Sequence, residues 1–410
     1  MTTAPTWICR PAARQWRALE PETAAPGFHA ELPGYRPTDL TELPALAEEL
    51  GVGRVFVKDE STRMGLGAFK VLGASWAVAR LLSDEGDRVT LDGLRRAAAA
   101  RPVELVTATD GNHGRAVAWM ARLLGLDARV FVPDVVPERA RAAIAAEGAT
   151  VTVAGGSYDE AVARAASYAG EGRRAGYADA GQPAAGGGRV LVQDTAWAGY
   201  EDVPGWIGEG YGTLLAELDR QFAERELAGP DLVSVPTGVG SLAQAVVTHY
   251  RRGERVLSDV GDVSGPEGDE VPEVPEVSAA SGVSGVPGVL AVEPESAAGV
   301  LASLHAGARV SVPTGGTVMA GLNCGSPSSL AWPVLAGGLD AAIAVPDHLA
   351  TAAGADLGRL GVWSGPSGAA ALAGVRAALT GPGSAGRRAG LGVSASSVVL
   401  LISTEGNGGA

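Results

Sequence analysis

Apolar and polar residues follow one another along the chain in a pattern typical of alternating strands and helices. Residues 55–57 predict a short buried strand that ends at Lys58. From there the pattern becomes regular. It predicts strands at 104–107, 129–132 and 150–153. It also predicts helices at 69–82, 137–147 and 158–169, and one more helix that follows the loop at 110–114 and ends at 124. Strands separated by helices of about 10 to 15 residues indicate βαβ units on a parallel sheet.

A second alternating series begins near Val190. It predicts strands at 231–235, 289–292 and 397–402, with a helix at 242–250. We therefore expect an α/β protein with two lobes, each a parallel sheet flanked by helices. The expected division is a large domain formed by residues 1–64 plus 189–410 and a small domain formed by 65–188, with a Gly/Ala-rich connector at 170–188.

Residues 253–288 interrupt the second series with Pro, Gly, Ser, Val and acidic residues. Such a composition buries too little apolar surface to offset the entropy lost on ordering. We expect a disordered surface insertion, with a functional acidic segment as the alternative.

Composition narrows the classes of function. The 410 residues are 46% hydrophobic, and 32 basic against 46 acidic residues give a net charge of −14. Such a field repels nucleic-acid phosphates and anionic lipids. No apolar stretch reaches the roughly 18 residues of a membrane span, and no leader-like segment begins the chain, so we expect a soluble, cytoplasmic protein. Cys9, Cys324 and five scattered His residues do not indicate a metal site.

Lysine is nearly absent, because Lys58 and Lys70 are the only two among the 32 basic residues. A function that requires an amine therefore has two candidates. Lys70 follows a glycine-rich stretch at 65–69 and begins an apolar helix. Desolvation there would lower the pKa of the amine and suit it to Schiff-base chemistry. The alternative is a surface lysine whose ammonium reaches solvent.

Two further segments follow a predicted strand and open a predicted helix. Residues 109–114 include Asn112, which offers a donor and an acceptor to a flat polar ring, although a helix cap explains the segment equally well. Residues 236–241 direct backbone N–H groups and a helix dipole toward an anion. Position 243 is Ala, so the dinucleotide pattern Gly-x-Gly-x-x-Gly is incomplete, and a single phosphate fits better than a pyrophosphate.

Together, these turns resemble the fold type II pyridoxal-phosphate enzymes, the tryptophan-synthase β or threonine-dehydratase family. The resemblance is narrower to the diaminopropionate ammonia-lyase family. It extends from about Phe28 to Asn407, excluding the insertion. Five segments carry it: residues 68–73, 107–114, 193–197, 318–325 and 401–406.

The resemblance implies pyridoxal 5'-phosphate bound in the cleft between the lobes. Lys70 would form the internal aldimine and act as a base, and Asn112 would hydrogen-bond the ring hydroxyl. Thr404 would face the pyridine nitrogen. Asp110 would be a second base on the face opposite Lys70, and Asp194 would hold an ammonium group. The phosphate would be held by Thr237, Gly238, Val239, Gly240 and Ser241.

Several residues depart from the family pattern. Asp39 replaces a usual Pro, Met64 a usual Phe, Gly67 a polar residue, and Pro366 the Glu of a Gly-Glu-Ser-Gly-Ala segment. Gly67 and Pro366 could alter substrate contacts without touching the cofactor. These departures could therefore change the substrate, whereas the type of reaction that the family catalyses is still expected.

The resemblance implies a carbon–nitrogen lyase that acts on a small amino acid. It would eliminate the β-amino group of 2,3-diaminopropionate and give pyruvate and ammonia, in a homodimer. One alternative is a serine or threonine dehydratase, or a β-replacement synthase, against which Asp110 and Asp194 argue. The other is a non-catalytic cofactor-binding module, against which the presence of Lys70 argues in a chain almost free of lysine.

Overall fold

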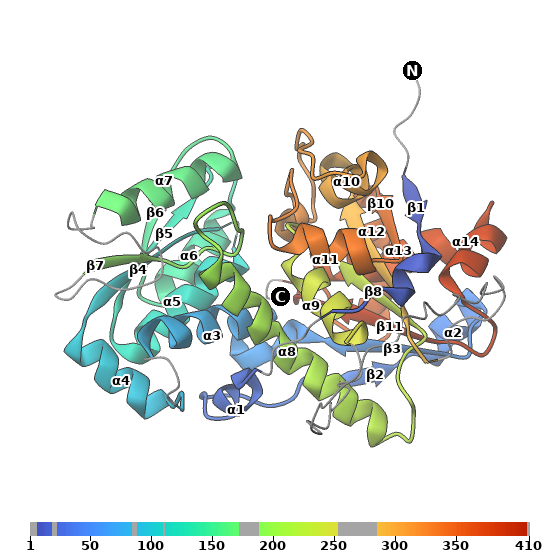
Figure 1. Cartoon of the computed structure of the whole chain (residues 1–410), viewed down its shortest axis with the longest axis horizontal. Helices are drawn as coiled ribbons and strands as arrows, with labels where there is room; N and C mark the ends of the chain where they lie inside the picture. Colours follow the sequence, from blue (N-terminus) through green and yellow to red (C-terminus); the bar gives the residue numbers. More distant parts are fainter. Residues whose placement is uncertain are drawn as a thin grey trace, which may run out of the picture.

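The computed structural model describes residues 6–18, 23–83, 88–109, 111–171, 188–252 and 285–407. These residues form two β-sheets flanked by helices (Figure 1). The larger sheet has the order β1 (Trp7–Cys9), β10 (Ala341–Val345), β9 (Gly288–Pro294), β8 (Leu232–Pro236), β11 (Val398–Ser403), β3 (Arg54–Asp59) and β2 (Leu40–Glu42). The smaller has the order β6 (Thr150–Val153), β5 (Asp127–Val132), β4 (Val103–Ala108) and β7 (Gly188–Leu191).

Strand directions confirm the expected α/β fold with one difference. All pairs in the smaller sheet are parallel, as are those joining the five central strands of the larger sheet. The two edge strands, β1 and β2, pair antiparallel to their neighbours. Each has only three residues, too few to give the pattern by which a strand is recognised.

The central strands of the larger sheet are apolar because helices cover both faces. Every residue of β8, β9 and β10 is buried. The polar exceptions have partners: Ser234 donates to the carbonyl of Ala371, and the Glu293 carboxylate accepts the backbone N–H groups of Val300 and Leu301. These contacts dock helices α13 (Pro366–Leu379) and α10 (Gly299–Ala306) against the sheet.

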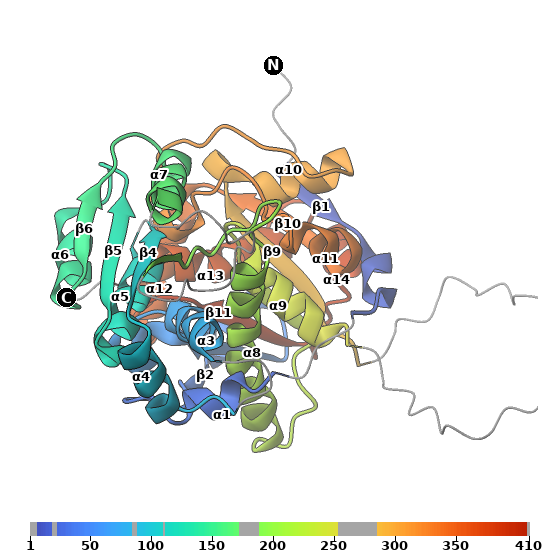
Figure 2. The same cartoon turned by 60° about the vertical axis from the view of Figure 1, so that its left-hand side comes forward.

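The helices fall into three groups. In Figures 1 and 2, α3 (Lys70–Leu82) and α8 (Asp202–Ala223) lie between the two sheets. The smaller sheet carries α4 (Leu91–Ala100), α5 (Asn112–Leu124), α6 (Glu138–Ala146) and α7 (Tyr158–Glu171). The remaining helices are α1 (Ala25–His29), α2 (Pro44–Leu50), α9 (Ser241–Tyr250), α10 (Gly299–Ala306), α11 (Ala331–Gly338), α12 (Asp347–Arg359), α13 (Pro366–Leu379) and α14 (Ser384–Leu391).

Two glycines allow α3 and α8 to approach closely. A Cβ atom on Gly73 would lie 2.7 Å from the Ile207 side chain, and one on Gly210 would lie 2.4 Å from the Leu72 carbonyl oxygen. Any larger residue would push the helices apart. Because α3 begins at Lys70, this contact fixes the direction in which that lysine enters the cleft.

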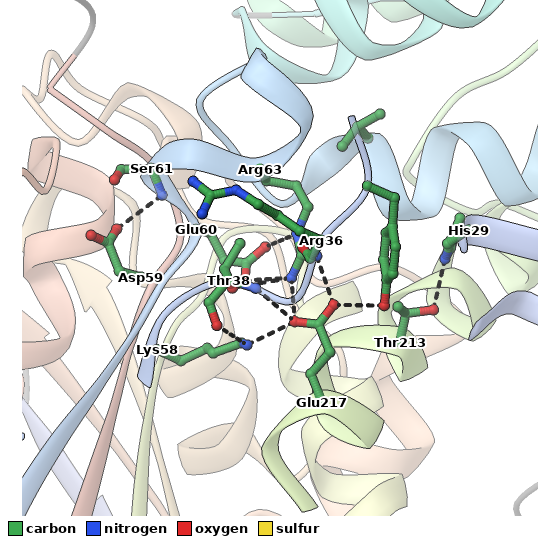
Figure 3. Close-up of polar contacts among 12 residues, drawn as sticks. His29, Arg36, Thr38, Lys58, Asp59, Glu60, Ser61, Arg63, Thr213 and Glu217 are labelled. Carbon is green, nitrogen blue, oxygen red and sulfur yellow. Dashed lines mark hydrogen bonds and ion pairs between the residues drawn. The ribbon is translucent and has the colours of Figure 1, made fainter. Parts of the chain in front are cut away.

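A buried ionic cluster joins α8 to the chain around β3 (Figure 3). Glu217 accepts from Lys58 Nζ and Arg63 Nη1, each at 2.7 Å, and Glu60 accepts from Arg63 Nε at 2.7 Å. All four side chains are fully buried. Thr38 completes the cluster by donating its hydroxyl to Glu60. Lys58 therefore has a structural role, which leaves Lys70 as the lysine facing the cleft.

The predicted strands and helices are present, with their ends shifted by a few residues. The division into two domains stays a prediction. Pairing of β7 with β4 places residues 188–191 in the smaller sheet, whereas the sequence pattern assigns 189 onward to the larger lobe. Most of the predicted connector and insertion, at 172–187 and 253–284, lies outside the described residues. Among the described helices, none is long and apolar enough to cross a membrane.

Candidate active site

A pocket opens between the two lobes and contains about 700 Å³ of space, including its mouth. Residues of α5, α7 and the segment after β7 face residues from the larger sheet. Its lining includes Lys70, Asn112, Asp194, Thr404 and the whole turn from Pro236 to Ala243. All the predicted site residues that the structure describes therefore meet in one pocket. Asp110 lies outside the described residues.

Lys70 and Asp194 form an ion pair in this pocket. Nζ of Lys70 lies 2.6 Å from Oδ2 of Asp194, and the lysine side chain is 20% exposed. The other oxygen of Asp194 accepts from the Tyr158 hydroxyl at 3.2 Å and from Gln193 Nε2 at 3.1 Å. Burial alone would raise the pKa of Asp194, but the Lys70 ammonium and the hydrogen bond from Tyr158 hold it well below its usual range. Asp194 is therefore an anion that already holds one ammonium group.

The turn between β8 and α9 is built from small residues. A Cβ atom on Gly238 would lie 3.1 Å from the Gly321 carbonyl oxygen and 3.2 Å from Cys324 Sγ. Gly240 has a φ of +98°, which favours glycine. Ser241, the first residue of α9, donates its hydroxyl to the Asp194 carbonyl. The turn thus presents the start of a helix to a narrow space, which suits a phosphate.

Asn112 and Thr404 lie on two other elements of the pocket. Asn112 is the first residue of α5, and its Nδ2 donates to Oε2 of Glu405 at 2.6 Å. Thr404 follows β11, and its carbonyl accepts from the Phe69 N–H at 3.1 Å. Ala68 and Glu405 form an antiparallel bridge. The chain that carries Thr404 is therefore tied to the turn that precedes Lys70.

The residues beside Asp110 are ordered by Thr109 and His113. Thr109 accepts the backbone N–H groups of Gly111 and Gly114 on its hydroxyl. His113 Nε2 lies 2.8 Å from the carbonyl oxygen of Val192. Burial lowers the pKa of His113, so its ring is neutral near pH 7. His113 thus orders the loop without adding charge to the pocket.

Sequence reasoning assigned no role to two residues that line this pocket, Tyr158 and Glu405. Tyr158 is the first residue of α7 and bonds Asp194, far from it in sequence. Glu405 directly follows Thr404, so a carboxylate beside a predicted site residue was a signal available from the sequence. Among the described residues, no group of three or more His, Cys, Asp or Glu residues could hold a metal ion.

The chemistry of these residues fits pyridoxal 5'-phosphate. The pocket offers a primary amine on Lys70, a glycine-containing turn at the start of α9 whose N–H groups suit a phosphate, and an amide at Asn112 that can bind a ring hydroxyl. Residues 31–394 match the family described as "Pyridoxal-phosphate dependent enzyme". The chain therefore belongs to the pyridoxal-phosphate-dependent enzymes, and its fold is that of fold type II.

Within this class, the chain is similar to diaminopropionate ammonia-lyases over most of its length. It is 34% identical over 334 residues to the enzyme of Salmonella typhimurium, covering 79% of this chain and 72% of that protein. It is 33% identical over 392 residues to the enzyme of Escherichia coli K12, covering 93% and 87%.

Comparison with solved structures finds the same similarity to diaminopropionate ammonia-lyase. The Escherichia coli enzyme in complex with D-serine superposes with a TM-score of 0.75 at 31% identity, covering 94% of this chain and 88% of that one. The same enzyme with an aminoacrylate-PLP azomethine reaction intermediate gives a TM-score of 0.73 at 31% identity, with the same coverage. A maize serine racemase, at 22% identity and a TM-score of 0.65, shares the fold.

Proposed function

We propose that this protein is a pyridoxal-phosphate-dependent carbon–nitrogen lyase that eliminates the β-amino group of 2,3-diaminopropionate, giving pyruvate and ammonia. The observation that carries the proposal is the Lys70–Asp194 ion pair, at 2.6 Å, inside a pocket suited to the cofactor. The similarity to diaminopropionate ammonia-lyases supports the substrate.

Each part of the cofactor has a candidate partner. Lys70 would carry the cofactor covalently, Asn112 would bind the ring hydroxyl, and Thr404 would face the pyridine nitrogen. The phosphate would be held by Thr237, Gly238, Val239, Gly240 and Ser241, which all line the pocket. When bound, the cofactor supplies an electron sink for the bond broken at the substrate Cα atom.

The chain's own residues would handle protons and charge. After the substrate has displaced its amine, Lys70 would accept the proton from Cα. While Lys70 carries the cofactor it would present no ammonium to Asp194, so the Asp194 carboxylate could hold the β-ammonium group of the incoming substrate. A protonated amine is the better leaving group, so an anion at this position favours elimination. Asp110 would serve as a second base, on the opposite face, so that both Cα configurations could react.

The main alternative is a serine or threonine dehydratase, or a β-replacement synthase of the same fold. Those substrates carry a hydroxyl or another neutral group where diaminopropionate carries an ammonium, so they make less use of the Asp194 carboxylate. A non-catalytic cofactor-binding module would need no base in the pocket. We further propose that the enzyme is a homodimer and acts in the cytoplasm on small amino acids.

One assay separates these possibilities. Purified enzyme loaded with cofactor is incubated in turn with D- and L-diaminopropionate, serine and threonine, and keto acid and ammonia are measured. We expect diaminopropionate to give both products with the highest kcat/KM, and a Lys70→Ala variant to give neither. Faster turnover of serine or threonine would favour the dehydratase. Cofactor binding without any turnover would favour the non-catalytic module.

A further inference from the structure

Glu405 joins three parts of the pocket through its side chain and backbone. Its Oε2 accepts from Asn112 Nδ2 at 2.6 Å, and its Oε1 accepts from the Ser367 N–H at 3.1 Å. Asn112 begins α5 beside the smaller sheet, whereas Ser367 lies in the first turn of α13 beside the larger one. The carboxylate therefore spans the pocket from one lobe to the other.

The backbone of Glu405 is held as firmly as its side chain. Its carbonyl accepts from the Gly365 N–H at 2.9 Å, and the next residue, Gly406, donates to the Gly67 carbonyl at 2.9 Å. An antiparallel bridge to Ala68 places it beside the turn that leads into Lys70. A carboxylate fixed in this way is an anchor against which a more mobile side chain can be oriented.

The chemistry of the contact determines how the Asn112 amide is turned. An ionised carboxylate only accepts hydrogen bonds, so it selects the NH2 end of the amide and repels the oxygen end. Burial raises the pKa of the Glu405 carboxyl, and the hydrogen bond from the Ser367 N–H, the Asn112 amide and the nearby Lys70 ammonium oppose that rise because they favour the ionised form. One N–H of Asn112 is used by Glu405. The second N–H remains for a ligand in the pocket, which Asn112 lines.

We propose that Glu405 is a positioning residue that fixes the Asn112 amide so that its second N–H binds the ring hydroxyl of the cofactor. This inference rests on the cofactor placement proposed above. It gives Glu405 a role through Asn112, without contact to the reacting atoms. Without the carboxylate, the amide could rotate and present its oxygen, which a deprotonated ring hydroxyl would repel.

A double-mutant cycle on cofactor affinity tests this coupling. The variants are Glu405→Ala, Asn112→Ala and the pair together, and the Kd of pyridoxal 5'-phosphate is measured by absorbance or fluorescence titration of the apoenzyme. We expect Glu405→Ala to weaken binding by about 10-fold, the loss of one hydrogen bond to a charged group. The double variant should bind no more weakly than Asn112→Ala alone. If the loss of affinity in the double variant equals the product of the losses in the two single variants, the residues act independently and the proposal is overturned.

Two further variants keep the test decisive. Glu405→Gln retains an oxygen that can accept from Asn112, so its Kd should lie between those of wild type and Glu405→Ala. This variant also replaces the alanine in the cycle if Glu405→Ala does not fold. Glu295→Ala removes an exposed carboxylate outside the pocket and should leave the Kd unchanged. If wild type binds no cofactor, the proposed function fails. If wild type binds and turns over but the losses multiply, only the role of Glu405 fails.

Discussion

Lys70 and Asp194 are 124 positions apart in sequence, yet Nζ and Oδ2 lie 2.6 Å apart in the pocket. The pair joins the first residue of α3 to the segment that follows β7. The Lys70 ammonium keeps the Asp194 carboxylate ionised, and the carboxylate in turn holds the amine in its orientation. In the proposed function, the same carboxylate would hold the substrate ammonium once the lysine amine is bound to the cofactor.

Asp194→Asn tests this second role. The amide keeps the size of the side chain but loses the charge, so the cofactor should still bind. Turnover of diaminopropionate should fall by roughly 100-fold or more, since the departing amine loses its stabilising anion. Serine has no β-ammonium, and any turnover of serine should fall less. Measuring kcat for both substrates decides the matter, because equal losses would mean that Asp194 serves only to orient Lys70.

Borohydride reduction of the cofactor-loaded enzyme, followed by peptide mapping, should place the label on Lys70. The chain has two lysines, so the map is simple. Lys58 is fully buried and donates to Glu217, Gln221 and the Thr38 carbonyl, so its amine has no access to the cofactor. Label on Lys58 would contradict the assignment of the pocket.

Glu217→Gln should be among the most destabilising single changes outside the pocket. It removes the carboxylate that pairs with both Lys58 and Arg63 and leaves two buried cations with less compensation. Breaking a buried ion pair from one side typically costs about 3 to 5 kcal/mol. Glu224→Gln, at an exposed position just after the same helix, is the matched control and should change stability by less than about 0.5 kcal/mol. Chemical denaturation of both variants compares them directly, and equal small effects would show that the cluster is dispensable.

The sequence was sufficient for the parts of the fold that repeat a local pattern. Strands such as β8 and β9 are short apolar runs bounded by turn residues, and each is fully buried. It was also sufficient for residues that follow a strand, since Asn112 and Ser241 each begin a helix at the pocket. The carboxyl ends of parallel strands gather such residues without any further information.

Features that depend on distant contacts could not be predicted. The 22-residue helix α8 carries glycines and a proline that weaken its helical pattern, and Gly210 is explained only by the α3 helix that packs on it. Glu217 is acidic in sequence but is buried by partners more than 150 positions away. Likewise, the contact between Asn112 and Glu405 joins residues 293 positions apart.

Acid should weaken the fold through His29. This residue is fully buried, its Nδ1 lies 2.7 Å from the Thr213 hydroxyl, and burial together with nearby Arg63 lowers its pKa from 6.5 to about 3 (Figure 3). Between these values the unfolded chain takes up a proton that the folded chain excludes, so the stability present at pH 7 is lost as pH falls below 6.5.

The size of this effect can be isolated with His29→Gln, which keeps a hydrogen-bonding side chain but does not titrate. Between pH 6 and pH 4.5, the free energy of unfolding of wild type should fall by about 2 kcal/mol more than that of the variant. Urea denaturation at several pH values measures the difference. Parallel curves for the two proteins would show that His29 is protonated in the folded state.

Asp110→Asn tests the proposed second base. Asn112, two residues further along the chain, lines the pocket and would remain, as would the phosphate turn, so the cofactor should still bind to Lys70. If Asp110 accepts the Cα proton on the face opposite Lys70, turnover of one enantiomer of diaminopropionate, expected to be the D form, should fall by roughly 100-fold or more. The L form should lose less, because Lys70 serves its face. Measuring kcat for both enantiomers on the variant separates the roles, and equal small losses would mean that Asp110 only caps the start of α5 and would strengthen the dehydratase alternative.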